Sequence, residues 1–347
     1  MGPRDRLDFR TVLMSETSKE PRSGIGHFFL FLKGLAMGAA DLVPGVSGGT
    51  VAFITGIYEE LIHTIKSVDL SVFKSLFKDG IASTWKKLNG TFLAVLFSGI
   101  FVSLASLSKG IAFLLETYPL QLWGFFFGLI VASSIIISKF IKTWDLRAIS
   151  MLVGGTAIAY FVTIMAPSQI PDGHVYTFLA GSVAICAMIL PGVSGSFLLV
   201  MLGAYEKILG SMSGVIDGLK AMDTAIIIAN GSTLLVFAFG CLLGLLAFSR
   251  FLSWMFKVAY SMTMAFLTGF MIGSLNKVWP WKETLETYIK HPGEENEKII
   301  PLVQQNVLPG NFTEITGDPA HMGMVITMAI VGFILIIGME KLAAKNA

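Results

Sequence analysis

Long apolar stretches separated by short polar ones dominate the chain, and two of these stretches are interrupted in the middle. Six are uninterrupted and close to the ~20 residues that a helix needs to cross a bilayer core. They run at about 91–108, 119–138, 147–166, 224–248, 256–275 and 322–340. Two more, at 27–65 and 175–206, contain Pro and Gly, which break helices. The pattern predicts an all-α polytopic membrane protein.

The two interruptions share one sequence. Residues 44–50 read PGVSGGT and residues 191–196 read PGVSGS, so five residues match without a gap at an offset of 147. The matches continue with Gly56 and Gly203, with Tyr58 and Tyr205, and with Glu59 and Glu206. Further on, Gly99 and Gly240, and Gly128 and Gly269, match at an offset of 141. The chain therefore reads as one membrane domain made of two related halves, 27–166 and 175–340.

Each half has one interrupted stretch and three spans. We expect each interrupted stretch to form a re-entrant helical hairpin that turns at the Pro-Gly loop and leaves on the side it entered; one long kinked span is the alternative for 27–65. Because three spans is an odd number, the second half enters the membrane upside down relative to the first. That arrangement is an inverted-topology repeat, as found in many transporters.

Charge supports this topology. With the N-terminus inside, 17 of the 25 Lys and Arg residues fall in inner segments, 7 fall in outer segments, and Lys33 lies in the first hairpin. The positive-inside rule then places both termini in the cytoplasm, including an N-terminal segment at 1–26, and places the 276–321 loop outside. Residues 66–90 alternate apolar side chains with five lysines, which is typical of a helix lying in the headgroup region; a plain polar connection is the alternative.

Composition narrows the class of protein further. The chain is 54% hydrophobic and 14% charged, against about 25% charged residues in soluble domains. It lacks the GxxxxGK[ST] element of ATP-driven pumps, its five histidines show no metal-ligand spacing, and its two cysteines lie in apolar segments. We therefore expect no cofactor, no metal site, no nucleic-acid partner and no catalytic residue.

The two loops offer hydrogen-bond donors inside an apolar setting. A helix that begins within a membrane has unpaired N–H groups and a partial positive charge at its first turn, which suits a phosphate or carboxylate. Glycines let a ligand approach the backbone, and hydroxyl side chains add donors. The predicted anion-binding residues are Gly45, Ser47, Gly48, Gly49, Thr50, Gly192, Ser194, Gly195 and Ser196. The alternative is that these glycines only permit tight helix packing.

Charged residues in and beside the hairpins need a partner or a task, since a charge in the bilayer costs ~3 kcal/mol or more. Lys33 is the candidate for a direct phosphate contact, and Asp41, which has Met188 as its counterpart, is the candidate for proton coupling or gating. A buried Lys33–Asp41 ion pair is the alternative. Glu59, Glu60 and Glu206 are further coupling candidates, or they pair with lysines at the interface.

With its paired PGVSGGT and PGVSGS loops, the chain resembles the polyprenyl-phosphate transporter family over about residues 24–338. The resemblance implies movement of undecaprenyl phosphate, the lipid carrier of cell-wall synthesis, from the outer to the inner leaflet of a bacterial plasma membrane. The loops are also similar to the PGxSRS element of membrane undecaprenyl-pyrophosphate phosphatases, but Gly48 and Gly195 stand where those enzymes have Arg. The hypothesis is a lipid-phosphate translocase; the alternatives are a pyrophosphate phosphatase and a transporter of a small soluble anion.

Overall fold

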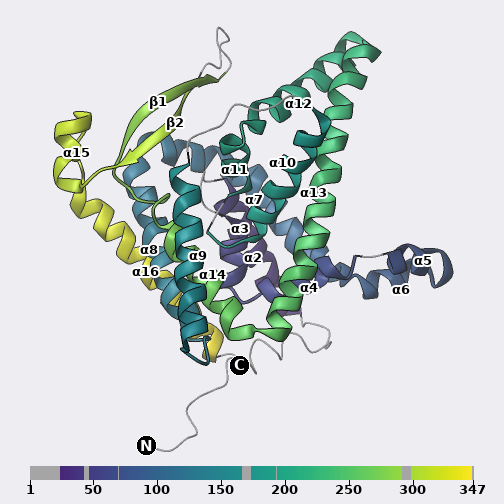
Figure 1. The fold of residues 1–347 in the computed structure, drawn as a ribbon, viewed down its shortest axis with the longest axis horizontal. Coiled ribbons are helices and arrows are strands. Elements are labelled where there is room, and N and C mark those ends of the chain that lie inside the picture. Colours follow the sequence, from purple (N-terminus) through teal and green to yellow (C-terminus); the bar gives the residue numbers. More distant parts are fainter. Residues whose placement is uncertain are drawn as a thin grey trace, which may run out of the picture.

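The computed structural model describes residues 24–42, 47–68, 70–165, 173–192, 194–290 and 298–345, and all statements below refer to these residues. They form a helical bundle with one small β-hairpin (Figure 1). The first half contains α2 (Gly24–Asp41), α3 (Gly48–Ile54), α4 (Tyr58–Lys66), α5 (Leu70–Lys78), α6 (Gly80–Lys87), α7 (Gly90–Thr117), α8 (Pro119–Ser138) and α9 (Leu146–Ile164). The second contains α10 (His174–Ile189), α11 (Gly195–Met201), α12 (Ala204–Ala221), α13 (Thr224–Val258), α14 (Tyr260–Ser274), β1 (Lys282–Lys290), β2 (Lys298–Asn306), α15 (Pro309–Thr316) and α16 (Met322–Lys345).

The helical membrane class is confirmed. Four helices in the described part of the chain are long and apolar enough to span a membrane, namely α7, α8, α9 and α13. The other two expected spans are shorter, because α14 has 15 residues and the apolar part of α16 is Met322–Gly338. At 1.5 Å per residue the 35-residue α13 is about 52 Å long, so it extends well beyond a ~30 Å hydrocarbon core.

Each expected hairpin begins with a longer helix, α2 or α10, and continues after the Pro-Gly loop as a seven-residue helix, α3 or α11. In the first, α3 and α4 follow the Pro-Gly loop; in the second, α11 and α12 follow it and meet at an angle of 105°. The matching residues Gly56 and Gly203 lie at the α3–α4 and α11–α12 breaks with φ of 76° and 64°. A side chain with a Cβ is strained at these angles, so the repeated glycine makes the same turn in both halves.

Close glycine contacts recur in both halves. In α2 and α7, a methyl group at Gly34 would collide with the Leu96 carbonyl, and one at Gly99 with the Phe31 carbonyl. The equivalents in α10 and α13 are Gly181 against Phe237 and Gly240 against Phe178. Helices of the two halves also pack against each other. Gly128 of α8 contacts Ala329 of α16, and Gly269 of α14 contacts Leu152 of α9. Small residues that let helix backbones approach are typical of membrane interfaces.

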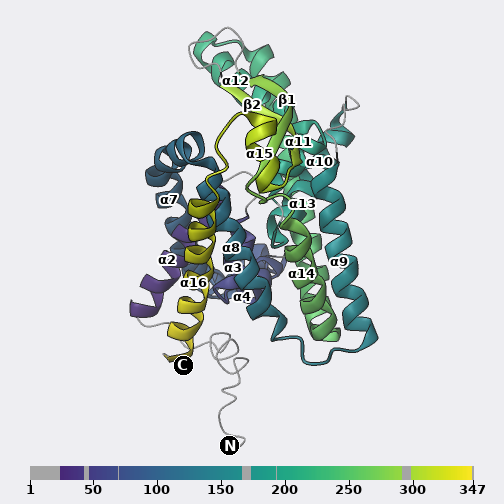
Figure 2. The same cartoon turned by 90° about the vertical axis from the view of Figure 1, so that its left-hand side faces the viewer.

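The two ends of the molecule carry different elements (Figures 1 and 2). The α8–α9 and α13–α14 connections and the C-terminal part of α16 lie at one end. The α12–α13 connection, the β1–β2 hairpin and α15 lie at the other. This grouping agrees with the inner and outer segments expected from charge. The opposite insertion of the two halves in a membrane, and the compartment that each end faces, stay predictions.

Two elements differ from the sequence-based expectation. The 276–321 loop contains an antiparallel two-stranded sheet, in which Lys282 pairs with Asn306, followed by α15. The segment 207–223, which is expected outside, is largely helical, because α12 continues to Ala221 and packs along α13 (Figure 1). The expected amphipathic segment is present as α5 and α6, which project sideways from the bundle (Figure 1).

Candidate functional site

The two Pro-Gly loops touch in the interior of the bundle. The Ser47 hydroxyl donates a 3.0 Å hydrogen bond to the Met188 carbonyl, just before the second loop. The Gly192 N–H donates a 2.8 Å hydrogen bond to Oγ1 of Thr50. Ser47 and Thr50 are buried, with 1% and 0% of their surface exposed. Residues 141 and 142 positions apart in the chain thus form one polar centre.

Backbone approach explains several of the loop glycines. A methyl group at Gly49 would lie 2.7 Å from the carbonyl oxygens of Met188 and Ile189. At Gly195 it would lie 2.7 Å from the Ala184 carbonyl oxygen. Gly192 has φ 102° and leaves no room for a side chain beside Ser274. Tight packing alone therefore requires these three glycines, whatever else they do.

In the first loop, the chain's own oxygens occupy the donors at the start of α3. The Gly48 N–H donates to Oδ1 of Asp41 at 2.6 Å, and the Gly49 N–H donates to the Ser47 hydroxyl at 3.0 Å. In the described residues the Asp41 carboxylate accepts this N–H hydrogen bond, and the Lys33–Asp41 ion pair stays an alternative. Asp41 therefore occupies an N–H donor at the start of α3 that the sequence predicts to be available to an anion.

The second loop is arranged differently. Ser194 precedes α11 but its side chain does not cap the helix. Instead the Ser194 and Ser196 hydroxyls form a hydrogen bond with each other at 2.7 Å. Ser194 is buried and Ser196 is exposed. In the described chain, fewer hydrogen-bond donors of the second loop are therefore bound to a cap or carboxylate than in the first loop.

The remaining predicted residues lie at varied distances from this centre. Lys33 is eight residues before Asp41 in α2, which separates their backbones by about 12 Å. Glu60 accepts a 3.0 Å hydrogen bond from Asn89, and Glu206 is exposed in the first turn of α12. Glu59 is partly buried in the first turn of α4. Gly45, with its neighbours 43–46, lies outside the described residues.

Two lysines that the loop motifs do not predict, Lys277 and Lys282, lie near the second loop. The Lys277 ammonium lies 4.2 Å from the centroid of the Phe197 ring, on α11. The Lys282 ammonium lies 4.0 Å from the centroid of the Trp123 ring and donates a 2.6 Å hydrogen bond to the Lys277 carbonyl. The sequence contains a signal for them, because both lysines flank the Trp-Pro-Trp run that follows a span end, but their charge alone indicates only membership of the expected outer loop.

Both lysines have pKa values below the usual range. Burial lowers the pKa of Lys277 to about 8. Burial also lowers the pKa of Lys282, and the neighbouring charge of Lys277 lowers it further. Each shift measures how much the site disfavours an uncompensated positive charge.

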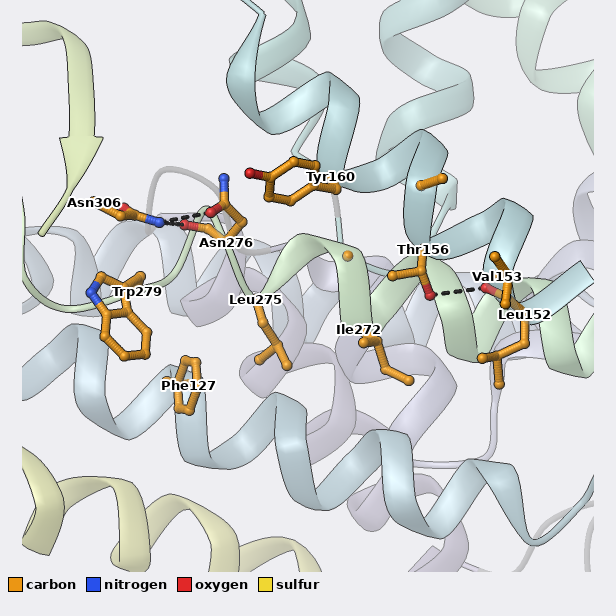
Figure 3. A pocket seen from close by; sticks show the side chains of 12 residues that line it. Phe127, Leu152, Val153, Thr156, Tyr160, Ile272, Leu275, Asn276, Trp279 and Asn306 are labelled. Carbon is orange, nitrogen blue, oxygen red and sulfur yellow. Dashed lines mark hydrogen bonds between the residues drawn. The ribbon is translucent and has the colours of Figure 1, made fainter. Parts of the chain in front are cut away.

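An apolar groove of about 780 Å³ runs between α8, α9 and α14 (Figure 3). Its walls are mostly aliphatic and aromatic, including Phe127, Val153 and Ile272. Tyr160, Asn276 and Asn306 lie toward one end, where the Asn306 amide donates 2.8 Å hydrogen bonds to the carbonyl and the side chain of Asn276 (Figure 3). Asn276 directly precedes Lys277, so the polar end of the groove adjoins the lysine segment.

Comparison with known proteins gives a consistent result. Residues 37–296, which include both loops, match the family model described as undecaprenyl phosphate translocase-like. The chain is 42% identical to a polyprenyl-phosphate transporter of Vibrio cholerae over 321 residues, covering 92% of this chain and 98% of that protein. It is 33% identical to a polyprenyl-phosphate transporter of Staphylococcus aureus over 261 residues, covering 72% and 85%. No solved structure matches the chain.

Proposed function

Because the chain belongs to the undecaprenyl phosphate translocase-like family, we propose that it is a multi-pass membrane transporter of a polyprenyl phosphate. Both curated relatives carry the name polyprenyl-phosphate transporter and come from bacteria. The direction we propose, from the outer to the inner leaflet of a bacterial plasma membrane, follows from the family resemblance. Transport in this direction recycles the lipid carrier.

One observation carries the proposal at the level of residues: the repeated loops of the two halves meet through the Ser47–Met188 and Thr50–Gly192 hydrogen bonds. We place the phosphate headgroup at this contact, with Ser47, Thr50, Ser194 and Ser196 as hydroxyl ligands. Repeat-built transporters commonly bind substrate where broken helices of two repeats meet, and relative movement of the repeats then exposes the site alternately to each side.

Asp41 is the gating group in this scheme. Its carboxylate accepts the hydrogen bond of the Gly48 N–H in this structure. A phosphate oxygen therefore reaches that donor only after the carboxylate moves or is protonated. Exchange of one anion for another at the same N–H group links substrate binding to the state of Asp41, which is the basis for the proposed proton coupling. Lys33, two turns away on α2, is proposed to meet the headgroup on that side of the loop.

The prenyl chain is proposed to lie in the apolar groove between α8, α9 and α14. The groove volume of about 780 Å³ is within the range of drug-sized ligand sites, so it accommodates part of a long isoprenoid while the rest stays in lipid. Its polar end adjoins the lysine segment, as expected for a ligand with an apolar chain and an anionic head.

A transporter fits the loop geometry better than a phosphatase. An Arg in place of Gly48 would meet the Asp41 carboxylate, whose Oδ2 lies 2.6 Å from the position of a Cβ. An Arg in place of Gly195 would meet the Ala184 carbonyl. The second loop therefore has no room for the catalytic Arg of the phosphatase pattern, because the obstacle at Gly195 is backbone, and an Arg at Gly48 would require the Asp41 side chain to move.

The test is leaflet-resolved transport of labelled undecaprenyl phosphate in proteoliposomes. We expect transport above that of protein-free vesicles and no competition of inorganic phosphate with the labelled lipid. Undecaprenyl pyrophosphate, supplied instead, should not release phosphate. Thr50→Val, which removes the acceptor for the Gly192 N–H at nearly constant volume, should reduce transport at least tenfold. Thr327→Val is the matched control, since this exposed Thr bonds only to the Gly323 carbonyl of its own helix. Phosphate release would instead favour the phosphatase, and competition by free phosphate a soluble-anion transporter.

A further inference from the structure

Two cationic side chains share a small region at the end of the molecule that carries the β-hairpin. The Lys282 ammonium donates to the backbone carbonyl of Lys277, which fixes both residues within one short segment. The segment is held in place from β2, because the Asn306 amide bonds to the Asn276 carbonyl, and the Trp279 indole donates to the Val307 carbonyl at 2.9 Å. The two charges are therefore positioned by the fold and do not extend freely into solvent.

Neither ammonium forms an ion pair with a carboxylate in the described part of the chain. Lys277 contacts the Phe197 ring, and Lys282 contacts the Trp123 ring and one carbonyl. Aromatic faces and a carbonyl attract a cation only weakly compared with a full negative charge. Two like charges, partly buried and without a counterion, are unfavourable for the folded protein unless an anion joins them.

The lysines also adjoin the second loop. Phe197, which lies under the Lys277 ammonium, directly follows Ser196. On the other side, Ser274 lies against Gly192 and accepts a 2.9 Å hydrogen bond from the Lys277 N–H through its carbonyl. Lys277 is thus connected to both ends of the second loop, whereas the first loop has its donors occupied by Asp41 and Ser47.

We propose that Lys277 and Lys282 form a cationic subsite that receives the phosphate monoester headgroup of the lipid substrate before it reaches the paired loops. This inference rests on the proposed transport function and adds a separate binding step on the β-hairpin side. The Asn276 end of the apolar groove lies next to this subsite, so the chain of the same lipid can enter the groove while its phosphate contacts the lysines. A phosphate dianion neutralises both ammonium groups, which a carboxylate of single charge does not.

The experiment measures equilibrium binding of a radiolabelled prenyl monophosphate, of the matched prenyl alcohol and of inorganic phosphate to the full-length protein in nanodiscs. We expect Lys277→Met and Lys282→Met each to weaken binding of the monophosphate about tenfold and to leave binding of the alcohol unchanged. Lys277→Arg should keep at least a third of the affinity, because it keeps the charge. Lys220→Met, on an exposed lysine paired with Asp217 on α12, removes the same charge and should have no effect.

A readout of stability separates binding from folding. Met is similar in length to Lys and avoids the unpaired charge, so both Met variants should unfold at the same or a higher temperature than the wild type. Weaker binding together with unchanged or raised stability therefore supports the subsite.

Three results would overturn it. Unchanged monophosphate affinity in both Met variants contradicts the subsite while leaving the transport function intact. Equal, lysine-dependent affinity for inorganic phosphate assigns the lysines to a free anion and not to the lipid. Wild-type protein that binds alcohol and monophosphate equally would contradict the proposed function itself.

Discussion

Asp41 is the residue whose substitution most directly tests the gating role. Asp41→Asn keeps an oxygen acceptor for the Gly48 N–H but removes the negative charge from the loop contact. We expect binding of the prenyl phosphate to be retained or to become a few times tighter, and transport to fall at least tenfold and to lose its dependence on pH. Binding in nanodiscs and transport in liposomes across pH measure the two effects. Asp217→Asn, on the surface, is the control, and normal transport by Asp41→Asn would rule out a gating role.

The lowered pKa of Lys277 gives a prediction about stability. Its pKa is about 8 in the folded protein, against an ordinary value near 10.5, so between these values the unfolded chain holds a proton that the folded chain has released. The free energy of unfolding of the wild type should therefore rise with pH in this window. Lys282, the charged neighbour, acts in the same direction because its pKa is also lowered.

We expect Lys277→Met to unfold about 2 °C above the wild type near pH 7, since about 1 kcal/mol shifts the melting temperature of a domain by a few degrees. The difference in melting temperature between the two proteins should shrink between pH 8 and 10.5. Thermal melts at several pH values measure it. Lys220→Met supplies the reference for removal of an exposed charge. A gap that stays constant across this pH range would mean that Lys277 is charged and satisfied in the folded state.

At the scale of elements, α5 and α6 have an exposed apolar side that the bundle does not cover. Phe77 and Ile81 are 86% and 76% exposed, and Trp85 is 49% exposed. The last turns of the two helices carry Lys78, Lys86 and Lys87. Apolar side chains beside lysines match a helix that lies in the headgroup region of a membrane.

A spin label at position 77, in a protein with Cys186 and Cys241 replaced by Ala, should report contact with lipid in nanodiscs. The measurement compares its accessibility to oxygen, which partitions into lipid, and to a water-soluble nickel complex. A label at Glu314, exposed on α15, provides the aqueous reference. Equal accessibility of the nickel complex at both positions would contradict membrane contact and favour a plain polar connection.

Regular elements were predictable where hydrophobic length and glycine spacing decide them. The four longest spans and the turns at Gly56 and Gly203 follow from such local signals. The β-hairpin did not, because Lys282–Lys290 and Lys298–Asn306 alternate polar and apolar residues only weakly and their pairing depends on register between strands. In the site, the meeting of the loops followed from the repeat. The Asp41–Gly48 bond and the placement of Lys277 depend on tertiary contacts that sequence spacing does not encode.

At the scale of the whole molecule, topology is the property that the repeat and the charge distribution predict together. In a protein without its native cysteines, Lys78→Cys on α5 should be labelled by an impermeant thiol reagent only from the cytoplasmic side. Thr284→Cys on β1 should be labelled only from outside. Both positions are exposed, so access is limited by the membrane and not by burial. Labelling of both from the same side would contradict the inverted arrangement of the halves.

The central claim is that the phosphate of a polyprenyl lipid binds where the two repeated loops meet. The most direct measurement is photocrosslinking with a polyprenyl phosphate that carries a photoreactive group in its first isoprene unit, followed by mapping of the labelled peptides. We expect labels within a few residues of Ser47–Thr50 and of Gly192–Ser196, all competed away by unlabelled polyprenyl phosphate but not by the alcohol. Labels that unlabelled polyprenyl phosphate removes, but that are confined to helices remote from both loops, such as the exposed face of α16, would contradict binding at the loops.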